Sequence, residues 1–386
     1  MFKRKRVVVI ATALFLILGF IGGGLYVYAQ GAARSIPRTN ALAGVAHPSS
    51  DGATNILLLG LDSRRDNNGN DLPRALLDTM HVGSSSSVGG YNTNTIILIH
   101  VPANGRQAIA ISIPRDDYVA VPGYGMRKIK EAYGIAKYYG ESDLLHKGVQ
   151  NPERERLSRD LGRAATIATI TNLLDVPIDH FAEVNLVSFY DLSRALGGIQ
   201  VCLNHSVNDA QYSGASFQAG LQTINGVDAL KFVRQRHGLE NGDLDRTHRQ
   251  QAFITGVITK LRSQGVFSDL GKLQSLIDVA KKDVVIDDNW DLLKFLPRAR
   301  NLTGGHITFY TLPIDHYAAR NGQSVNIIND GLVKSFVHHL FYPEKKIGST
   351  DNSATGKVTS TPTPVLGHAA QGNGVPVDGG AIPCVN

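Results

Sequence analysis

The chain has 386 residues, of which 42% are hydrophobic and 19% are charged, and its formal net charge at pH 7 is +6. This length and apolar content are enough for an ordinary packed core, and two cysteines are too few for a disulfide scaffold. Four basic residues lie within the first six positions. The rest of the chain is therefore only mildly basic and does not require a nucleic-acid partner.

The N-terminus combines a basic cluster with a long apolar run. Residues 1–6 read Met-Phe-Lys-Arg-Lys-Arg, and residues 7–29 contain no charged side chain. A run of this length spans the ~30 Å hydrocarbon core of a bilayer, and the basic cluster keeps the N-terminus in the cytoplasm. We therefore expect a single-pass membrane protein whose main domain lies outside the cytoplasm. A cleaved signal peptide is the alternative, since residues 29–32 are mostly small.

The two ends of the exported part differ in composition from its middle. Residues 30–50 are small and polar, which predicts a spacer, and residues 346–386 are rich in Gly, Ser, Thr, Pro and Asn, which predicts a disordered tail. That tail is either passive or in contact with the cell wall. Cys202 and Cys384 either form a disulfide that pins it or remain free thiols. The folded domain is expected at 51–345.

Within that domain, short apolar runs alternate with helical patterns. The run at 55–60 ends in glycine and is followed by Asp62, Ser63 and Arg64, as expected at the end of a buried strand. A polar insertion at 66–91 is interpreted as a loop with at most one short helix, around 73–80. Further strands are predicted at 95–101, 108–113, 199–203 and 307–312, and helices at 163–174, 186–196 and from Asp245 onward. This alternation predicts an α/β domain with helices on both faces of a sheet.

An arginine-rich segment at 229–251 is the strongest chemical signal. Arg234 and Arg236 are two residues apart, whereas Arg246, Arg249 and Gln250 have helical spacing. Asp243 and Asp245 are placed to cap the start of that helix. A helix N-terminus with several guanidinium groups suits a phosphate, because free N–H groups and bidentate arginines bind its oxygens. A solvated basic helix face is the alternative, and spacing alone does not decide between the two.

Several separated motifs have the order and spacing of one known family. Between about Asn55 and Arg262, the chain resembles the LytR-CpsA-Psr family through the groups Asp62-Ser-Arg64, Pro114-Arg115-Asp116, Arg127-Lys-Ile-Lys-Glu-Ala-Tyr133, Gly197-Gly-Ile-Gln-Val-Cys-Leu203, Val233-Arg-Gln-Arg-His-Gly238 and Gly242-Asp-Leu-Asp-Arg246. Any one of these groups alone is a weak signal, but together they are specific. The resemblance implies a central mixed β-sheet flanked by helices on both faces.

The resemblance also implies a function in the bacterial cell envelope. Such a protein is expected to be a membrane-anchored phosphotransferase that moves a polyprenyl-pyrophosphate-linked glycopolymer onto peptidoglycan. Similarity to actinobacterial members in the tail and the His-Gly motif suggests arabinogalactan as the polymer. A hydrolase of the polyprenyl pyrophosphate and a catalytically weak lipid-binding scaffold are the alternatives. A regulator of transcription is disfavoured, because a domain outside the membrane cannot reach DNA.

The family pattern assigns roles to individual residues. A pyrophosphate would be held by Arg64, Arg115, Lys128, Arg234, Arg236, Arg246 and Gln250. Mg²⁺, or Mn²⁺, would be held by Asp62 and by a second ligand. The family's Asp-Thr-Met motif matches Asp78 literally, but Asn94 has the expected distance of 21 residues to Arg115 and is followed by a strand. Asn94 is therefore preferred, and a neutral ligand should weaken metal binding.

The candidates for proton transfer remain open. Asp116 and Asp243 either accept a proton from the attacking hydroxyl or orient arginines, and His237 is the alternative base. The sequence has no convincing Ser-His-Asp, zinc or P-loop signature, which favours direct phosphoryl-type transfer. The polyprenyl chain needs an apolar groove, for which the helices at 163–196 are the expected walls, although they could equally be core.

Overall fold

The computed structural model describes residues 31, 34–45, 47–80, 82, 90–263, 270–292, 294–295, 307–343, 377–378 and 382–386. The expected transmembrane anchor at 7–29 lies outside these residues. Within the described ranges, none of the helices has both the length and the apolar character needed to cross a membrane.

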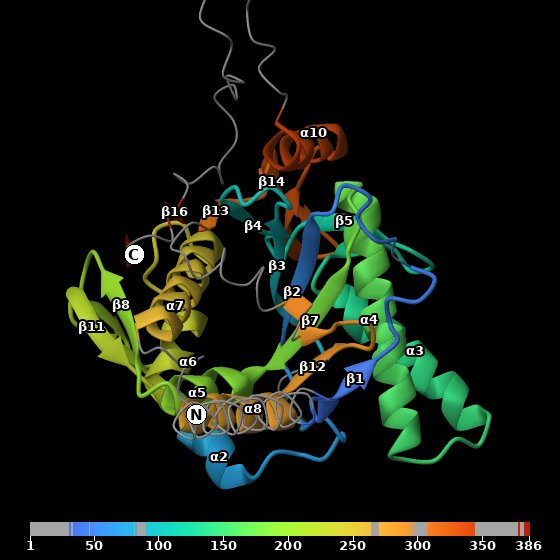
Figure 1. Ribbon diagram of the computed structural model, residues 1–386, viewed down its shortest axis with the longest axis horizontal. Coiled ribbons are helices and arrows are strands. Elements are labelled where there is room, and N and C mark those ends of the chain that lie inside the picture. The colour runs from blue at the N-terminus through green and yellow to red at the C-terminus, as the bar shows by residue number, and fades with distance from the viewer. Residues whose placement is uncertain are drawn as a thin grey trace, which may run out of the picture.

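A mixed sheet of eight strands forms the centre of the described molecule (Figure 1). The strands in spatial order are β1 (Arg38–Thr39), β12 (Val284–Asp287), β7 (His180–Asn185), β2 (Thr54–Leu61), β3 (Thr93–Val101), β4 (Ala108–Ser112), β13 (Ile307–Thr311) and β16 (Val377–Asp378). β2 is parallel to β7, β4 is parallel to β13, and β3 runs antiparallel to both β2 and β4. The carboxyl ends of β2, β4, β7 and β13 therefore meet the start of β3 at one edge.

The pairing of β2 with β3 is irregular at this edge. Gly60 is opposite Thr95, but Leu61 is opposite Thr93, so the register shifts by one residue between Gly60 and Leu61. A Cβ atom on Gly60 would lie 2.7 Å from the Cβ of Thr95, so glycine allows the two strands to approach closely. A bulge of this kind redirects side chains. Here it lies beside Asn94 and directly precedes Asp62.

Three helices cover one face of the sheet: α3 (Glu131–His146), α4 (Glu153–Leu174) and α10 (Asp330–Phe341). Alternate residues of β2, Leu57 and Leu59, are fully buried in the same core cluster as Ile167 and Ile170 of α4. This alternation is the period of two expected for a strand whose faces contact different layers. The helix predicted at 163–174 is thus the second half of α4 and belongs to the core.

The other face is covered by α7 (Asp243–Ser263) and α8 (Leu270–Asp283). Ile254 of α7 packs against a buried cluster that includes Ile97 of β3 and Phe309 of β13. The expected α/β fold with a central mixed sheet is therefore confirmed, and helices lie on both of its faces.

A second apolar cluster lies beside the sheet, beneath α2 (Arg74–Thr79), α5 (Leu186–Ala195) and α6 (Gly226–Arg234). It includes a three-stranded sheet of β11 (Gly220–Ile224), β8 (Ile199–Leu203) and β17 (Cys384–Val385). The remaining strands form three hairpins: β5 (Tyr118–Val121) with β6 (Gly125–Lys128), β9 (Val207–Asp209) with β10 (Ala215–Phe217), and β14 (His316–Arg320) with β15 (Gln323–Ile327).

Both ends of the described chain join these sheets. Cys202 and Cys384 form a disulfide, and β17 pairs in parallel with β8. β16 pairs with β13, and β1 pairs with β12. These short strands correct the expectations of a spacer at 30–50 and a disordered tail at 346–386 for the residues concerned. Strands of two residues have no sequence period, so only their partners define them.

Candidate active site

A pocket of about 110 Å³ opens at the sheet edge where β2 and β4 end and β3 begins. Its polar wall and its apolar wall come from different elements. The polar residues are Asp62, Asn94, Thr95, Arg115, Arg234, Arg236, Arg246 and Gln250. The apolar residues include Leu186 and Phe189 of α5 and Leu230 and Val233 of α6. The fold therefore brings three separate motifs of the sequence to one place.

Asp62 is held from both sides by its neighbours. Its backbone N–H donates to the carbonyl of Asn92 at 2.8 Å. One carboxylate oxygen accepts from Nη1 of Arg64 at 2.6 Å, and the other accepts from Nδ2 of Asn94 at 2.7 Å. Asn94 and Asp62 are thus direct neighbours, and the role of Asn94 as second metal ligand stays a prediction.

Arg115 continues this chain of contacts towards α7. Its Nη1 donates to Oδ1 of Asn94 at 2.8 Å, and its Nε lies 3.2 Å from Oδ1 of Asp243. Asp243 also accepts from Nη2 of Arg246 at 3.0 Å. Because Asp243 is the first residue of α7, its carboxylate at the helix N-terminus is stabilised while it positions two arginines.

Two arginines of the pocket, Arg234 and Arg246, are poorly compensated. The pKa of Arg246 is lowered to about 10, chiefly by burial and also by the positive charges of Arg115 and Arg236, and Asp243 only partly opposes the shift. Burial also lowers the pKa of Arg234, assisted by Arg64 and Arg236. The Nε atoms of Arg64 and Arg246 are buried without a hydrogen-bond acceptor among the described residues. Buried donors that lack an acceptor, together with mutually repelling cations, favour binding of an anion.

Asp116 forms the far end of the polar cluster. Lys128 and Lys130 approach its Oδ1 at 3.1 and 2.7 Å. Burial alone would raise the pKa of this carboxyl, but Arg115, Lys130 and Lys128 lower it on balance. Asp116 is therefore ionised and positions cations. Lys130 is a site residue that the sequence motif contained but the assignment of roles missed.

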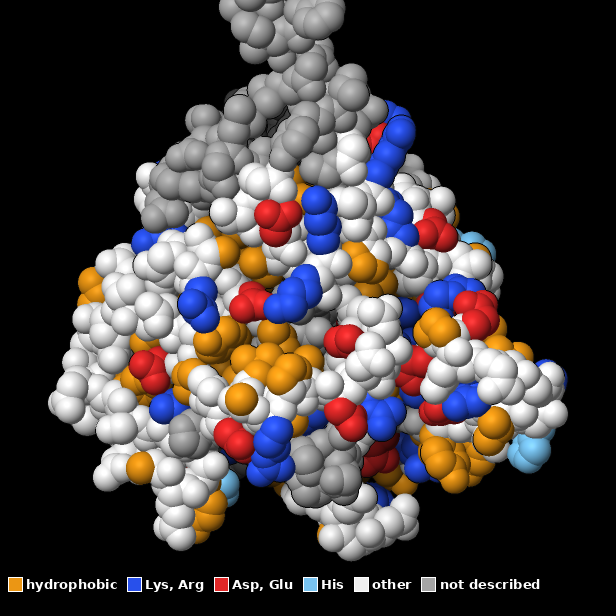
Figure 2. All heavy atoms as spheres, turned by 90° about the horizontal axis from the view of Figure 1, so that it is seen from below, with side chains coloured by type: hydrophobic (Ala, Val, Ile, Leu, Met, Phe, Trp, Pro, Cys, Tyr) orange, Lys and Arg blue, Asp and Glu red, His pale blue; other side chains and the backbone are white. Residues whose placement is uncertain are grey.

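On the face shown in Figure 2, basic and acidic side chains are interspersed around apolar patches. The convergence of arginines in the pocket is thus not an extension of a broad basic surface on this face. The alternative of a solvated basic helix face disagrees with burial for α7, because Arg246 and Arg249 are only 5% and 0% exposed, although Arg236, which precedes the helix, is exposed.

Comparisons with known proteins agree with this geometry. A sequence profile described as the LytR_cpsA_psr family matches residues 25–340. The chain belongs to this family. The cell wall biosynthesis protein LcpA of Corynebacterium glutamicum is 40% identical over 79% of this chain, which spans about 60% of the length of that relative. The transferase TagU of Bacillus licheniformis, named polyisoprenyl-teichoic acid--peptidoglycan teichoic acid transferase, is 32% identical over 54% of this chain and 60% of its own.

Solved structures with low sequence identity share the fold. The structure titled "TagT bound to LI-WTA" superposes with a TM-score of 0.54 and 20% identity, covering 78% of this chain and 97% of that chain. Another, of Bacillus subtilis TagV, has a TM-score of 0.52 and 20% identity over 76% of this chain and 98% of its own.

The other residues considered for this LytR_cpsA_psr site lie at different distances from the pocket. Arg64 is buried behind Asp62, and Lys128 contacts Asp116 without lining the pocket. Asp78 is on α2, is more than half exposed and pairs with Arg74 at 2.9 Å. His237 is 53% exposed, with Nδ1 3.9 Å from Asp209, and is not part of the pocket wall.

Arg249 is buried on α7, away from the pocket. It donates to the side chain of Gln235 at 2.6 Å and to the carbonyl of Asn386 at 2.5 Å. Its role is therefore to hold α7 against the end of α6 and against the segment pinned by the disulfide. Within the expected walls at 163–196, α5 lines the pocket, whereas Ile167 and Ile170 of α4 lie in the core of the opposite face.

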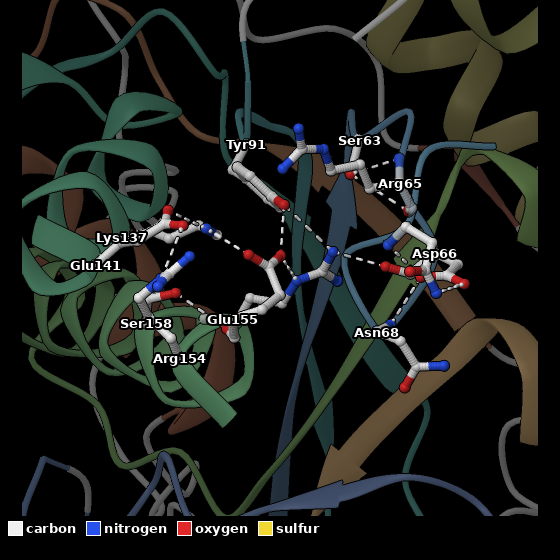
Figure 3. Close-up of polar contacts among 12 residues, drawn as sticks. Ser63, Arg65, Asp66, Asn68, Tyr91, Lys137, Glu141, Arg154, Glu155 and Ser158 are labelled. Carbon is white, nitrogen blue, oxygen red and sulfur yellow. Dashed lines mark hydrogen bonds and ion pairs between the residues drawn. The ribbon is translucent and has the colours of Figure 1, made fainter. Parts of the chain in front are cut away.

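A buried network on the α4 side supports the segments that carry Asp62 and Asn94 (Figure 3). Glu155 accepts hydrogen bonds from the hydroxyl of Tyr91 at 2.5 Å and from Nε of Arg159 at 2.7 Å, and pairs with Lys137 at 2.8 Å. Arg159 in turn donates to the carbonyl of Asp66 at 2.7 Å. Tyr91 is three residues before Asn94, and Asp66 is four residues after Asp62. The network therefore restrains both chain segments.

Proposed function

We propose that this protein is a cell-envelope phosphotransferase that moves a polyprenyl-pyrophosphate-linked glycopolymer onto peptidoglycan. One observation carries the proposal: a single pocket combines Arg115, Arg234, Arg236 and Arg246 with Asp62 on one side and an apolar wall from α5 and α6 on the other. A lipid pyrophosphate likewise combines an anionic group with an apolar chain. The names of TagU and of the TagT complex support this substrate class.

The pocket is suited to the charge of the substrate. A pyrophosphate offers several anionic oxygens, and each charge-assisted hydrogen bond contributes ~1.5–3 kcal/mol. Binding it would supply an acceptor for the buried Nε–H group of Arg246 and reduce the repulsion between Arg246, Arg115 and Arg236. Gln250 adds a neutral donor at the pocket wall. Leu186, Phe189, Leu230 and Val233 would contact the first part of the polyprenyl chain.

The donor set fits a hard divalent cation with few protein ligands. Asp62 supplies a carboxylate at the pocket wall, and Asn94 supplies a neutral oxygen that now accepts from Arg115. Mg²⁺ usually takes one or two protein carboxylates and completes its shell with water and substrate phosphates. When bound, Mg²⁺ or Mn²⁺ would neutralise charge on the phosphate oxygens.

The transfer step follows from these positions. An acceptor hydroxyl oxygen forms a bond to the phosphorus attached to the glycopolymer, and the bridging P–O bond breaks. Polyprenyl phosphate leaves with the electron pair, and the hydroxyl proton passes to solvent or to a carboxylate. Asp116 and Asp243 each bind cations, so we assign them the positioning of Arg115, Arg246, Lys128 and Lys130. Positioning and charge stabilisation are the main requirements of phosphoryl transfer.

Three finer features belong to the same proposal. Residues 7–29 anchor the protein in the membrane with the N-terminus in the cytoplasm, as the basic cluster before the apolar run supports. The domain then faces the envelope, where both substrates lie. Arabinogalactan is the proposed polymer, supported by the similarity to LcpA of Corynebacterium glutamicum, a cell wall biosynthesis protein.

The test uses the full chain in detergent with Mg²⁺, a polyprenyl-pyrophosphate-linked glycan and soluble peptidoglycan strands. The expected result is a glycan joined to peptidoglycan through a phosphodiester, with release of polyprenyl phosphate. Release without joining, at the same rate when the strands are omitted, would instead show the hydrolase. Binding of the lipid without any release would show the scaffold. Absence of both binding and release would reject the site.

A further inference from the structure

A second hollow lies beside the active-site pocket, between α3 and the start of β3. Its volume is about 420 Å³, and its walls include Tyr91, Asn92, Arg127, Glu131, Ile135 and Tyr138. None of these residues lines the pocket that contains the arginines. We call this hollow the α3 groove.

The α3 groove and the pocket share a wall. The carbonyl of Asn92, in the groove, accepts from the backbone N–H of Asp62, in the pocket, at 2.8 Å. The next residue, Thr93, donates its N–H to the carbonyl of Lys130 at 3.1 Å. Arg127 of the groove directly precedes Lys128, which pairs with Asp116. A chain that extends out of the pocket past Asn94 would therefore enter the groove.

The chemistry of the α3 groove suits sugar rings. Tyr138 is 68% exposed, and its ring and that of Tyr139 pack in a T-shaped arrangement with centroids 5.4 Å apart. An exposed aromatic face can cover the apolar side of a pyranose, while amide and charged groups bond its hydroxyls. Asn92, Arg127 and Glu131 provide such groups along the same groove.

The charge of the groove distinguishes between possible occupants. Lys137 is almost fully buried at its base and is compensated by Glu141 and Glu155, each at 2.8 Å. Arg127 and Glu131 carry opposite charges, so the α3 groove has no excess of positive charge like that of the pocket. It therefore fits a hydroxyl- and amide-rich glycan better than a polymer rich in phosphate.

The in-line geometry of the transfer step also favours the acceptor as the occupant of the α3 groove. The polyprenyl phosphate leaves towards the apolar wall of α5 and α6, and the attacking oxygen must approach roughly in line from the opposite side. The helix α3, which contributes to the groove, lies to the right of the central strands, whereas α5 and α6 lie to their lower left (Figure 1). We infer that the α3 groove binds the sugar rings of the acceptor peptidoglycan strand next to the ring whose hydroxyl attacks. This inference rests on the proposed function.

The test replaces exposed side chains, so that folding is preserved. In full-length protein, Tyr138→Ala should raise the half-saturating concentration of soluble peptidoglycan strands at least about fivefold, the loss expected for one aromatic contact. The half-saturating concentration of the lipid-linked donor should not change. Tyr138→Phe should restore acceptor binding, because it keeps the ring. Leu221→Ala is the matched control, since Leu221 is 62% exposed on β11, outside the groove.

A binding measurement separates this inference from the proposed function. Soluble strands are titrated into wild-type and Tyr138→Ala protein without donor or metal, and a weaker affinity of the variant supports the groove even if no transfer is detected. Absent transfer by the wild type would count against the proposed function alone. Equal affinity of the two proteins, or a change confined to the donor in the transfer assay, would overturn the assignment of the groove to the acceptor.

Discussion

One cluster of buried charge lies beneath α4 and another lies in the pocket at the sheet edge, and their arginines differ in how well they are compensated. On the α4 side, Arg163 donates two hydrogen bonds to Glu183, at 2.8 and 2.9 Å, and a third to Asp160 at 2.8 Å. Burial alone would lower the pKa of Arg163, but Glu183 raises it. In the pocket, burial lowers the pKa of Arg246 to about 10 and its neighbours do not reverse the shift.

The degree of compensation distinguishes arginines that stabilise the fold from arginines that are available to a ligand. A buried arginine with a bidentate carboxylate is fully satisfied and has no capacity for a ligand. A buried arginine that faces other cations has unused donors and a local excess of positive potential. Both clusters are built from the same residue types, so only their pairing distinguishes the cluster that we propose binds an anion.

The largest expected effect comes from breaking the satisfied cluster. Glu183→Gln leaves Arg163 buried without its bidentate partner, and loss of one member of a buried pair costs about 3–5 kcal/mol. We expect a large fall in the urea midpoint, with unchanged turnover per folded molecule. Glu153→Gln is the control, because the Glu153–Arg156 pair is exposed and its loss should not move the midpoint. Equal effects of the two variants would contradict the distinction.

Substitutions in the pocket should lower turnover and leave stability largely unchanged. Arg236→Ala or Arg246→Ala should reduce turnover at least about tenfold, because each removes charge that stabilises the transition state. The midpoint of unfolding should not fall for Arg246→Ala, since the removed guanidinium is poorly compensated in the free protein. Arg262→Ala, an exposed residue in the last turn of α7, is the control for a lost positive charge on the same helix. Full activity in both pocket variants would show that these arginines do not take part in catalysis.

Acid should weaken the network around Glu155. Burial would raise the pKa of this carboxyl, but hydrogen bonds from Lys137, Tyr91 and Arg159 lower it to about 2, below its ordinary value of 4.5. A depressed pKa stabilises the fold above pH 4.5 and loses that contribution as the pH falls towards 2. The stability difference between wild type and Glu155→Gln should therefore shrink between neutral pH and about pH 3. Urea midpoints measured across this range give the result, and a constant difference would contradict the assignment.

Local sequence patterns predicted the strands and the site residues that directly follow them. Apolar runs located β2, β3 and β4, and the residues after them gave Asp62 and Arg115. The preference for Asn94 over Asp78 rested on the strand that follows Asn94, and the structure places Asn94 2.7 Å from Asp62. The role of these residues in binding metal or phosphate stays a prediction.

Other features required the tertiary structure. The helix α3 was not predicted, because the apolar residues in Glu131–His146 do not recur with a clear helical period. The Glu155 network joins Asp66, Tyr91, Lys137 and Arg159, which no short motif connects. The disulfide was left open because spacing in sequence does not determine distance in space.

The smallest expected effect concerns the residue that links Asp62 to Arg115. The substitution Asn94→Asp places a second carboxylate opposite Asp62. It also removes the hydrogen bond that Nδ2 of Asn94 donates to Asp62 at 2.7 Å. Without metal, the two carboxylates repel, so the midpoint of unfolding should fall slightly. With Mg²⁺ or Mn²⁺ the same pair becomes a better ligand set, and half-maximal turnover should need severalfold less metal. A metal titration that measures both activity and unfolding separates the repulsion between the two carboxylates from the gain in metal binding. Unchanged metal dependence would show that Asn94 serves only to position Asp62 and Arg115, and that Asp62 alone supplies the protein's carboxylate.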